Sequence, residues 1–349
     1  MATPSADPRP DAFDSSDRTV VVLGATGQQG SGVVLHLLAR TSFRVIGLSR
    51  SPSSSASRAL LEKHKTHVEA GRFQLMAADV GDVSTLDKAF EGAWGVFGVT
   101  QFQTPLKTEE DLAFDFTGGK NLVDAAKTAG ISHLIYSGLP SPSAATSGKF
   151  QHIYHFEHKA AVEKYGLATL GADKLTILHA GLFYNNLTWP QYAKKASDGV
   201  LEFRAPLSEG KLVAWADPSY DVGLYVSELF LLGPFLTSGK TYPVHTTPAV
   251  SLSTLSSLYT EKTGLPSRVA PTSLEEWTAT VVASEGPGIA RDITEMIQFF
   301  DWSPYEEGRM DLGCMDGEEY EERMKELGGR VRASTFEEWL ERSGFGARE

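Results

Sequence analysis

A histidine and a lysine four residues apart are the side chains of this sequence best suited to moving a proton. His155 and Lys159 lie in a segment where Phe156 and Val162 indicate a helix. Because residues four apart share one face of a helix, we expect the imidazole and the ammonium group to lie next to each other. Ser137 ends the strand expected just before this helix. An imidazole or ammonium group of suitable pKa acts as a general acid, so these three residues are our candidate catalytic group.

A glycine-rich turn near the N-terminus is the second chemical feature. Residues 20–23 read as a buried strand, and glycines follow at positions 24, 27 and 30, just before an amphipathic run. In such a strand–turn–helix unit the first glycine allows a tight turn, and the second lets backbone N–H groups approach a pyrophosphate. The third lets helix and strand pack closely. The helix N-terminus then faces the phosphates. An ordinary surface turn also collects glycines, but the flanking strand and helix favour a dinucleotide site.

The end of the second expected strand indicates which dinucleotide. NAD-selective sites carry an acid about 20 residues past the glycines, and this sequence has no Asp or Glu between Thr41 and Leu61. It has Arg50 there instead. A guanidinium group binds a phosphate through two N–H groups, whereas a carboxylate repels it. Arg50 therefore favours NADP(H) over NAD(H); the alternative is a solvated loop arginine.

Five strands alternate with helices in the first half of the chain, at 20–23, 43–48, 73–78, 95–99 and 131–136, and a further strand is expected at 174–178. This order predicts an α/β fold with a Rossmann-type doubly wound parallel sheet. Ligands of such sheets bind beyond the carboxyl ends of the strands. That edge should carry Gly27, Arg50, Asp79, Thr100 and Ser137.

The helices of this half are expected at 53–64, 83–90 and 108–129. Asp79 either lies by the adenine of a bound nucleotide or caps the second of these helices. Asp82 is the better placed of the two for capping, because it comes directly before that helix.

From about Pro190 the regular alternation is lost. Short strands are expected at 201–205, 212–216 and 241–245, and helices at 220–232, 252–263, 274–283 and 289–300, in a region rich in tryptophan. We expect a disordered tail at 1–17 and an NADP(H)-binding Rossmann domain at 18–180. A smaller mixed α/β lobe at 181–349, interleaved with the first, should close over the cofactor and form a substrate or partner pocket.

Composition narrows the partners and the compartment. The 349 residues carry a net charge of −12, which argues against direct binding to nucleic acid or to an anionic membrane. No apolar run approaches the ~20 residues that span a bilayer. The single cysteine, Cys314, allows no internal disulfide, and residues 1–17 lack the features of a signal or transit peptide. We expect a cytoplasmic protein, with the nucleus also open to it, and an exposed acidic helix at 318–326.

Four segments together resemble the NmrA-like family of atypical short-chain dehydrogenases. They are residues 24–30, 99–102, 155–159 and 182–186, and the resemblance runs from Arg18 to the low 300s. It implies an NADP(H) site in which the glycine turn holds the pyrophosphate and Arg50 the 2′-phosphate. The resemblance also implies Asp79 by the adenine, Thr100 near the ribose or the nicotinamide, and Lys159 on the nicotinamide ribose. Tyr184 and Asn185 would line the nicotinamide end of the pocket. The implied cofactor-binding set is Gly24, Thr26, Gly27, Gln28, Gln29, Gly30, Arg50, Asp79, Thr100, Lys159, Tyr184 and Asn185.

The family pattern is altered at one position. Short-chain dehydrogenases place a tyrosine four residues before the lysine, and here His155 stands there. Tyr154 is one residue away and so points about 100° round the helix. The family includes redox-sensing regulators that bind a dinucleotide and a transcription factor, and reductases in which a lysine works without the tyrosine. The sequence leaves open a sensor and an NADPH-dependent reductase of a small aromatic or secondary-metabolite carbonyl, imine or enone.

Two further interpretations are less favoured. His152, His155 and His158 lie close in sequence, but no acid or cysteine completes a metal site with them, so we expect no metal. A purely structural protein that has lost its nucleotide is the other, and the intact glycines and Arg50 count against it.

Overall fold

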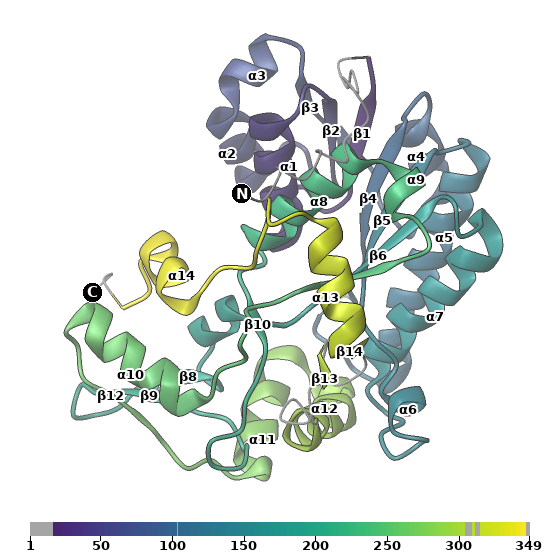
Figure 1. The fold of residues 1–349 in the computed structure, drawn as a ribbon. Coiled ribbons are helices and arrows are strands. Elements are labelled where there is room, and N and C mark those ends of the chain that lie inside the picture. The colour runs from purple at the N-terminus through teal and green to yellow at the C-terminus, as the bar shows by residue number, and fades with distance from the viewer. Residues whose placement is uncertain (1–16, 103, 304–308, 311–314, 347–349) are drawn as a thin grey trace, which may run out of the picture.

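The structure is a computed structural model that describes residues 17–102, 104–303, 309–310 and 315–346 (Figure 1). The predicted N-terminal tail up to residue 16 and Cys314 lie outside the described residues.

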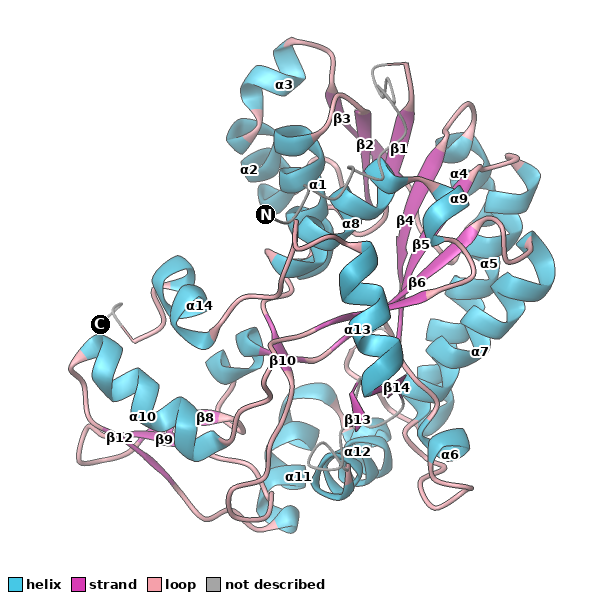
Figure 2. Cartoon of the chain, viewed as in Figure 1, coloured by secondary structure: helices cyan, strands magenta, loops and turns pink. Residues whose placement is uncertain are grey.

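A parallel sheet of seven strands forms the larger lobe (Figure 2). The strand order is β11-β6-β5-β4-β1-β2-β3, and every pairing is parallel. This order, with helices on both faces, confirms the Rossmann-type prediction. The strands are β1 (Thr19–Val22), β2 (Arg44–Ser49), β3 (Phe73–Ala77), β4 (Gly95–Val99), β5 (His133–Gly138), β6 (Leu175–Ala180) and β11 (Thr241–Val244).

Alternate side chains of β1 enter two different cores, as the period of two in a strand requires. Val20 and Val22 belong to the core beneath α1 (Gln28–Arg40) and α8 (Asp221–Leu232). Val21 packs in the core on the opposite face. The helices that contribute to that second core are α4 (Val83–Phe90), α5 (Phe114–Thr128) and α7 (Tyr154–Leu170).

Two glycines let α1 and α8 touch backbone to backbone. A Cβ at Gly223 would lie 2.0 Å from the carbonyl oxygen of Gly32, and a Cβ at Gly32 would lie 2.5 Å from that of Ser219. Because α8 comes from the second half of the chain, this contact fastens that half to the helix that follows the glycine turn.

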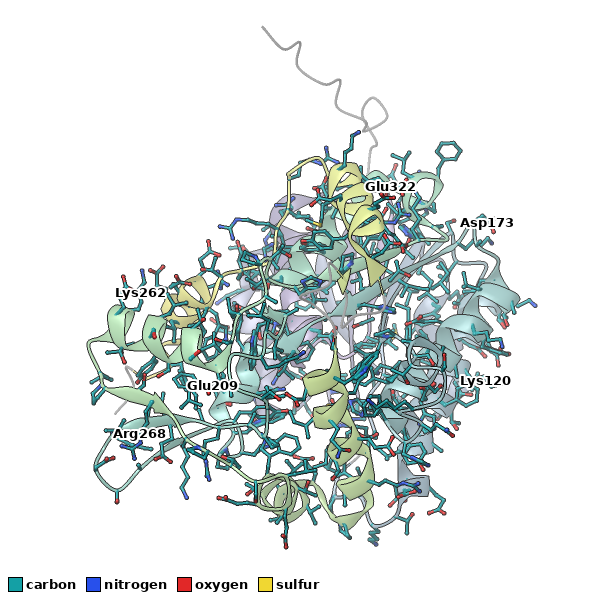
Figure 3. All side chains as sticks on the ribbon, turned by 60° about the horizontal axis from the view of Figure 1, so that its bottom comes forward. Lys120, Asp173, Glu209, Lys262, Arg268 and Glu322 are labelled. Carbon is teal, nitrogen blue, oxygen red and sulfur yellow. The ribbon has the colours of Figure 1, made fainter. Side chains whose placement is uncertain are left out.

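The smaller lobe holds a three-stranded sheet in the order β12-β9-β8 and a separate parallel pair, β7 and β10. Arg268 lies at the rim of the three-stranded sheet (Figure 3), where it pairs with Asp198 at 2.7 Å and Glu202 at 2.6 Å. The strands are β7 (Leu182–Phe183), β8 (Ala193–Lys195), β9 (Leu201–Phe203), β10 (Trp215–Ala216) and β12 (Ser267–Val269). The longer helices are α10 (Leu252–Thr263), α11 (Leu274–Glu285), α12 (Ala290–Trp302) and α14 (Phe336–Ser343).

The remaining elements are short or return to the larger lobe. The acidic helix α13 (Gly317–Glu326) packs on β11, where Glu326 accepts hydrogen bonds from Lys240 and Tyr242. The others are α2 (Ser55–Lys63), α3 (Lys65–Glu69), α6 (Pro142–Ala145), α9 (Pro234–Thr237), β13 (Arg309–Met310), β14 (Met315–Asp316) and the 3-10 turns η1 (Glu109–Ala113), η2 (Tyr184–Thr188) and η3 (Pro287–Ile289). None of the described helices is long and apolar enough to cross a membrane.

The elements differ from the predicted ones in two ways that matter for the site. The helix expected at 108–129 is divided into η1 and α5. The strand expected at 241–245 is β11, which pairs with β6 in the main sheet. The second half of the chain therefore contributes both β11 and α8 to the larger lobe, and the two lobes are interleaved.

Candidate active site

One cavity of about 890 Å³ runs along the carboxyl ends of the strands. All five residues expected at that edge line it: Gly27, Arg50, Asp79, Thr100 and Ser137. Apolar and aromatic side chains close the other side, and we call this set the aromatic wall. Phe102 and Phe156 come from the sheet side, and the smaller lobe contributes Trp189, Tyr192, Trp277, Val281, Ile289, Ile293, Met296 and Phe300.

The glycine turn is shaped to receive a phosphate group. Gly24 has φ +59°, which favours glycine, and its carbonyl oxygen accepts a hydrogen bond of 2.8 Å from the Gly27 N–H. A Cβ at Gly30 would lie 2.2 Å from that same oxygen, so the helix can approach the strand only without a side chain. No side chain caps α1, whose first turn begins at Gln28. Its N–H groups are therefore available to an anion, and the site fits a pyrophosphate.

Every residue predicted for this turn lies in the cavity wall. Thr26, Gln28 and Gln29 join the three glycines there. Arg50, directly after β2, is exposed, lines the cavity and makes no hydrogen bond or ion pair with the part of the chain that the structure describes. Asp79 Oδ1 accepts a hydrogen bond from the Gly81 N–H at 2.8 Å. Asp82 caps α4 through the Ser84 N–H, as predicted.

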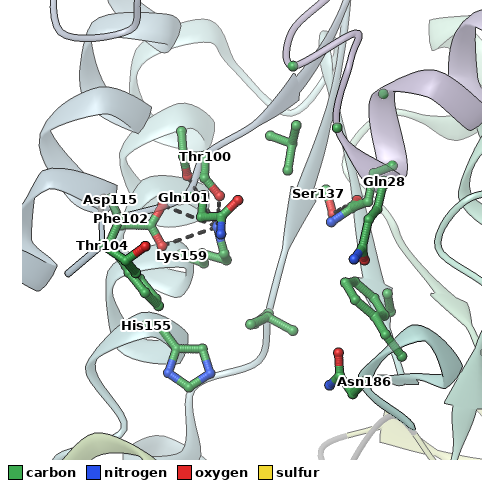
Figure 4. A pocket seen from close by; sticks show the side chains of 18 of the residues that line it. Gln28, Thr100, Gln101, Phe102, Thr104, Asp115, Ser137, His155, Lys159 and Asn186 are labelled. Atoms are coloured by element: carbon green, nitrogen blue, oxygen red, sulfur yellow. Dashed lines mark hydrogen bonds and ion pairs between the residues drawn. The ribbon is translucent and has the colours of Figure 1, made fainter. Parts of the chain in front are cut away.

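Lys159 is held by protein groups on the cavity wall (Figure 4). Its Nζ donates to the Thr100 carbonyl oxygen at 2.6 Å, to Thr100 Oγ1 at 3.2 Å and to Asp115 Oδ1 at 3.2 Å. Since an ammonium group has three N–H bonds, these acceptors account for all of them. The Asp115 side chain is only 1% exposed, so Lys159 neutralises a buried carboxylate.

A tyrosine completes this cluster from behind. The Tyr136 hydroxyl lies 3.0 Å from Thr100 Oγ1, and both side chains are buried. Burial, with Asp115 nearby, raises the pKa of Tyr136 well above its ordinary value. Tyr136 does not line the cavity and therefore does not replace the missing tyrosine of the family pattern.

His155 also lines the cavity, and the buried carboxylate of Asp292 contacts both its ring and its backbone. Its Nδ1 lies 2.5 Å from Asp292 Oδ1, and its backbone N–H donates to Asp292 Oδ2 at 2.9 Å. The other ring nitrogen, Nε2, makes no hydrogen bond with the described residues. Tyr154 points away, as its place on the helix predicts: its hydroxyl donates to Glu109 at 3.1 Å.

Ser137 is in the cavity wall, but its hydroxyl is engaged. Its Oγ donates to Gln29 Oε1 at 2.7 Å, which ties the end of β5 to the first turn of α1. Figure 4 shows Ser137 across the cavity from Lys159 and His155. The structure therefore does not bring the three candidate catalytic residues together: Lys159 and His155 share one wall, and Ser137 lies on the other.

Tyr184 and Asn185 require a correction, because neither lines the cavity. Tyr184 is fully buried and stacks on Trp215, and its hydroxyl oxygen lies 3.0 Å from Thr246 Oγ1. Asn185 accepts a hydrogen bond from Trp339 Nε1 at 2.9 Å. Their neighbours Phe183 and Asn186 line the cavity in their place, because the turn of η2 directs consecutive side chains to different sides.

The other two histidines of this region have protein partners. His152 Nδ1 lies 2.5 Å from Glu295 Oε1, and His158 Nδ1 lies 3.0 Å from the Leu112 carbonyl oxygen. Within the described residues there is no group of three or more potential ligands that could hold a metal ion. Sequence reasoning missed Asp292 and the individual residues of the aromatic wall; tryptophan enrichment was the only signal that pointed to this lobe.

Comparisons with known proteins identify the family to which the chain belongs. A model described as the NmrA-like family matches residues 16–340, and the chain belongs to that family. An NmrA-like family domain-containing oxidoreductase of a Cladobotryum species is 31% identical over 210 residues, which make up 58% of this chain and 58% of that protein. One from Aspergillus flavus is 30% identical over 280 residues, 75% of this chain and 78% of that protein. The match thus spans less than two thirds of the first relative's length.

A solved structure shows the same fold. NmrA, described as a negative transcriptional regulator and crystallised with NADP, superposes with a TM-score of 0.69 at 21% identity, covering 95% of this chain and 98% of that one. The same regulator has also been crystallised with NAD.

Proposed function

We propose that this protein binds NADP(H) and reduces a small, largely apolar aromatic substrate at a carbonyl, imine or enone group. The observation that carries the proposal is that one cavity contains both the glycine turn and the aromatic wall, with His155 exposed to it. The oxidoreductase names of the curated relatives and the NADP complex of the structural neighbour support the same assignment.

The residues divide into a nucleotide half and a substrate half. We assign the pyrophosphate to the first turn of α1, the 2′-phosphate to Arg50, the adenine side to Asp79 and the nicotinamide ribose to Thr100 and Lys159. When bound, NADPH would supply a hydride. The aromatic wall would bind the substrate and exclude water, which strengthens electrostatic interactions at the reacting atoms.

His155 is the better proton donor of the two candidates. The N–H bonds of Lys159 already serve Thr100 and Asp115, whereas His155 lines the cavity and its Nε2 has no hydrogen-bond partner among the described residues. An imidazole can also act as a general acid when its ring is protonated. We therefore assign proton donation to His155 Nε2 and a holding role to Lys159.

The test is the consumption of NADPH, followed by its absorbance, with a panel of aromatic aldehydes, ketones, imines and enones. We expect turnover with at least one class and a loss of about 10²-fold or more in kcat for His155→Ala. Turnover that His155→Ala leaves intact would remove this residue from the mechanism.

A redox-sensing regulator is the second candidate function. Two observations favour it. The position of the catalytic tyrosine holds His155, and the N–H groups of Lys159 are already bound to Thr100 and Asp115. The motif therefore lacks its usual proton donor, and only His155 could take that role. A sensor would bind NADP⁺ and NADPH with measurably different affinity in calorimetry and would consume NADPH with no member of the substrate panel. Equal affinity for both redox forms would count against sensing.

A further inference from the structure

We infer that Asp292 is a positioning residue, which accepts the Nδ1 proton of His155 and so directs Nε2 toward the cavity as the atom that donates a proton when the ring is protonated. This inference rests on the proposed reductase function and adds to it a second-lobe residue, supplied by α12, that works through His155.

Two carboxylates of α12, those of Asp292 and Glu295, bind histidines at or just before the start of α7 with the same pattern of contacts. Asp292 accepts the His155 backbone N–H at 2.9 Å and lies 2.5 Å from the His155 Nδ1. Glu295 accepts the His152 backbone N–H at 2.8 Å and lies 2.5 Å from the His152 Nδ1. His155 lies in the first turn of α7, whose N–H groups lack partners within the helix, and His152 lies in the loop directly before that helix. Each acid therefore stabilises the junction between α7 and α12, and this shared role needs no catalysis.

The two pairs differ in what their imidazoles face. His155 lines the cavity and His152 does not. The Asp292 side chain is 0% exposed, whereas that of Glu295 is 21% exposed. A fully buried carboxylate beside a cavity-lining imidazole is the arrangement that fixes a tautomer and stabilises the imidazolium form. The His152–Glu295 pair is thus a matched control within the same helix junction.

The geometry specifies which nitrogen carries which proton. An ionised carboxylate only accepts hydrogen bonds, so His155 Nδ1 donates to Asp292 and Nε2 is left for the substrate. Proton donation requires the imidazolium form, in which Nδ1 still donates to Asp292 and Nε2 carries a second proton. With bound NADPH supplying a hydride to the substrate carbon, His155 would give the Nε2 proton to the substrate oxygen or nitrogen. The neutral imidazole would then be reprotonated on Nε2 from solvent.

The groups around His155 do not supply a competing partner. From its own helix, Lys159 faces the same cavity but is bound to Asp115 of α5 and to Thr100. The rings of Phe102 and Phe156 pack edge-on against the imidazole. Among the described residues, Asp292 is therefore the charged group in contact with the imidazole, and the charged groups that line the same cavity are Lys159, Asp115, Glu285, Arg50 and Asp79.

The first test needs no substrate. Nitrogen-15 NMR of the histidine rings in the nucleotide-free protein reports the tautomer and the titration of each imidazole. We expect neutral His155 to carry its proton on Nδ1 in the wild type. Asp292→Asn should weaken this preference, because an amide can both accept and donate a hydrogen bond at Nδ1. Glu295→Gln should leave the His155 tautomer unchanged. A wild-type spectrum with the proton on Nε2 would overturn the inference even if the variant fails to fold.

The second test uses kinetics. We expect Asp292→Asn to lower kcat by about 10- to 100-fold, while the Kd for NADPH stays within about twofold and the descending alkaline limb of the kcat profile moves to lower pH. Glu295→Gln should weaken the helix junction to a similar degree, seen as a lower Tm, yet keep kcat. In a His155→Ala background, Asp292→Asn should cause no further loss of kcat.

The outcomes separate this inference from the proposed function. If no compound of the panel is turned over, the reductase function fails, and the spectra still decide the tautomer. If the wild type is active and Asp292→Asn retains its kcat, then Asp292 is only a structural clamp and the inference fails alone.

Discussion

Two cations of the cavity wall, Lys159 and Arg50, differ in how far the protein already satisfies them. Lys159 is committed to Thr100 and to the buried Asp115. Arg50 has no hydrogen-bond or ion-pair partner among the described residues. A cation with protein acceptors on every N–H is suited to holding structure, whereas a free guanidinium is suited to binding a ligand phosphate.

Replacement of Arg50 by alanine should therefore change nucleotide preference. We expect Arg50→Ala to weaken NADPH binding by about 10- to 100-fold, the loss of charge-assisted hydrogen bonds to one phosphate, and to leave NADH binding nearly unchanged. Calorimetry with both nucleotides measures this. Arg58→Ala is the control, because Arg58 lies on α2 outside the cavity wall. An equal loss for NADPH and NADH would show that Arg50 does not contact the 2′-phosphate.

Lys159 should matter for stability as well as for binding. Lys159→Met leaves the Asp115 carboxylate buried without its counter-ion, and we expect the free energy of unfolding to fall by about 3–5 kcal/mol. Urea unfolding measures the change. Adding Asp115→Asn should restore at least half of the loss, because it removes the uncompensated charge. A Lys159→Met protein as stable as the wild type would contradict the role of Lys159 as the counter-ion of Asp115.

At the scale of elements, the turn between β1 and α1 works because three glycines meet different spatial demands. A Cβ at Gly30 would lie 2.2 Å from the Gly24 carbonyl oxygen, whereas a Cβ at Gly27 would lie 3.2 Å from it. The first contact cannot be relieved without moving backbone, and the second needs a shift of only a few tenths of an ångström.

The two alanine replacements should therefore differ. We expect Gly30→Ala to lower the free energy of unfolding by about 2–3 kcal/mol through overpacking and to abolish measurable NADPH binding, because α1 must move away from the turn. Gly27→Ala should cost about 1 kcal/mol or less and weaken binding only partly. Thermal unfolding and calorimetry on both variants decide, and equal effects would show that the approach of α1 to the Gly24 carbonyl oxygen does not set the demand for glycine.

The sequence predicted well those elements whose signal is local. β4 and α4 begin and end where expected, because each is determined by residues close together in the sequence: a short apolar run for β4, and a helical apolar pattern with the Asp82 cap for α4. The pairing of β11 with β6 and the crossing of α8 on α1 were not predictable. The sequence of a short strand does not indicate which strand it pairs with, and a glycine such as Gly223 does not indicate which helix packs against it.

In the candidate site, too, the features with a local sequence signal were predictable and those that depend on contacts between distant segments were not. The glycine turn and Arg50 follow from positions relative to one strand each. Asp292 lies 137 residues from His155, and only the packing of α12 on α7 brings them together. Tyr184 was misplaced because a motif gives the order of residues but not which of them the turn of η2 directs into the cavity.

At the scale of the whole molecule, the interleaved lobes bury polar groups that make stability depend on pH. His36 of α1 is buried against Tyr220, and burial, with smaller effects of Arg40 and Arg342, lowers its pKa to about 4. The unfolded chain protonates this histidine near pH 6.5. Its contribution to stability is therefore fully present above about pH 6.5 and is lost as the pH falls toward 4.

His36→Phe should reduce this acid sensitivity. Between pH 6.5 and 5 the wild type should lose about 2 kcal/mol more than the variant, as measured by denaturant unfolding at each pH. Burial also raises the pKa of Asp221 to about 6, which opposes the trend, but Asp221 is present in both proteins and cancels in the comparison. Parallel pH profiles for the two proteins would contradict the prediction.

The most direct test of the nucleotide site is calorimetric titration of the wild-type protein with NADPH and NADH. We predict one site per chain, saturable by both nucleotides, with NADPH bound about 10- to 100-fold more tightly through the Arg50 contact. Absence of binding heat with either nucleotide, confirmed by an unchanged Tm at millimolar concentration, would contradict the nucleotide site and with it the proposed reductase.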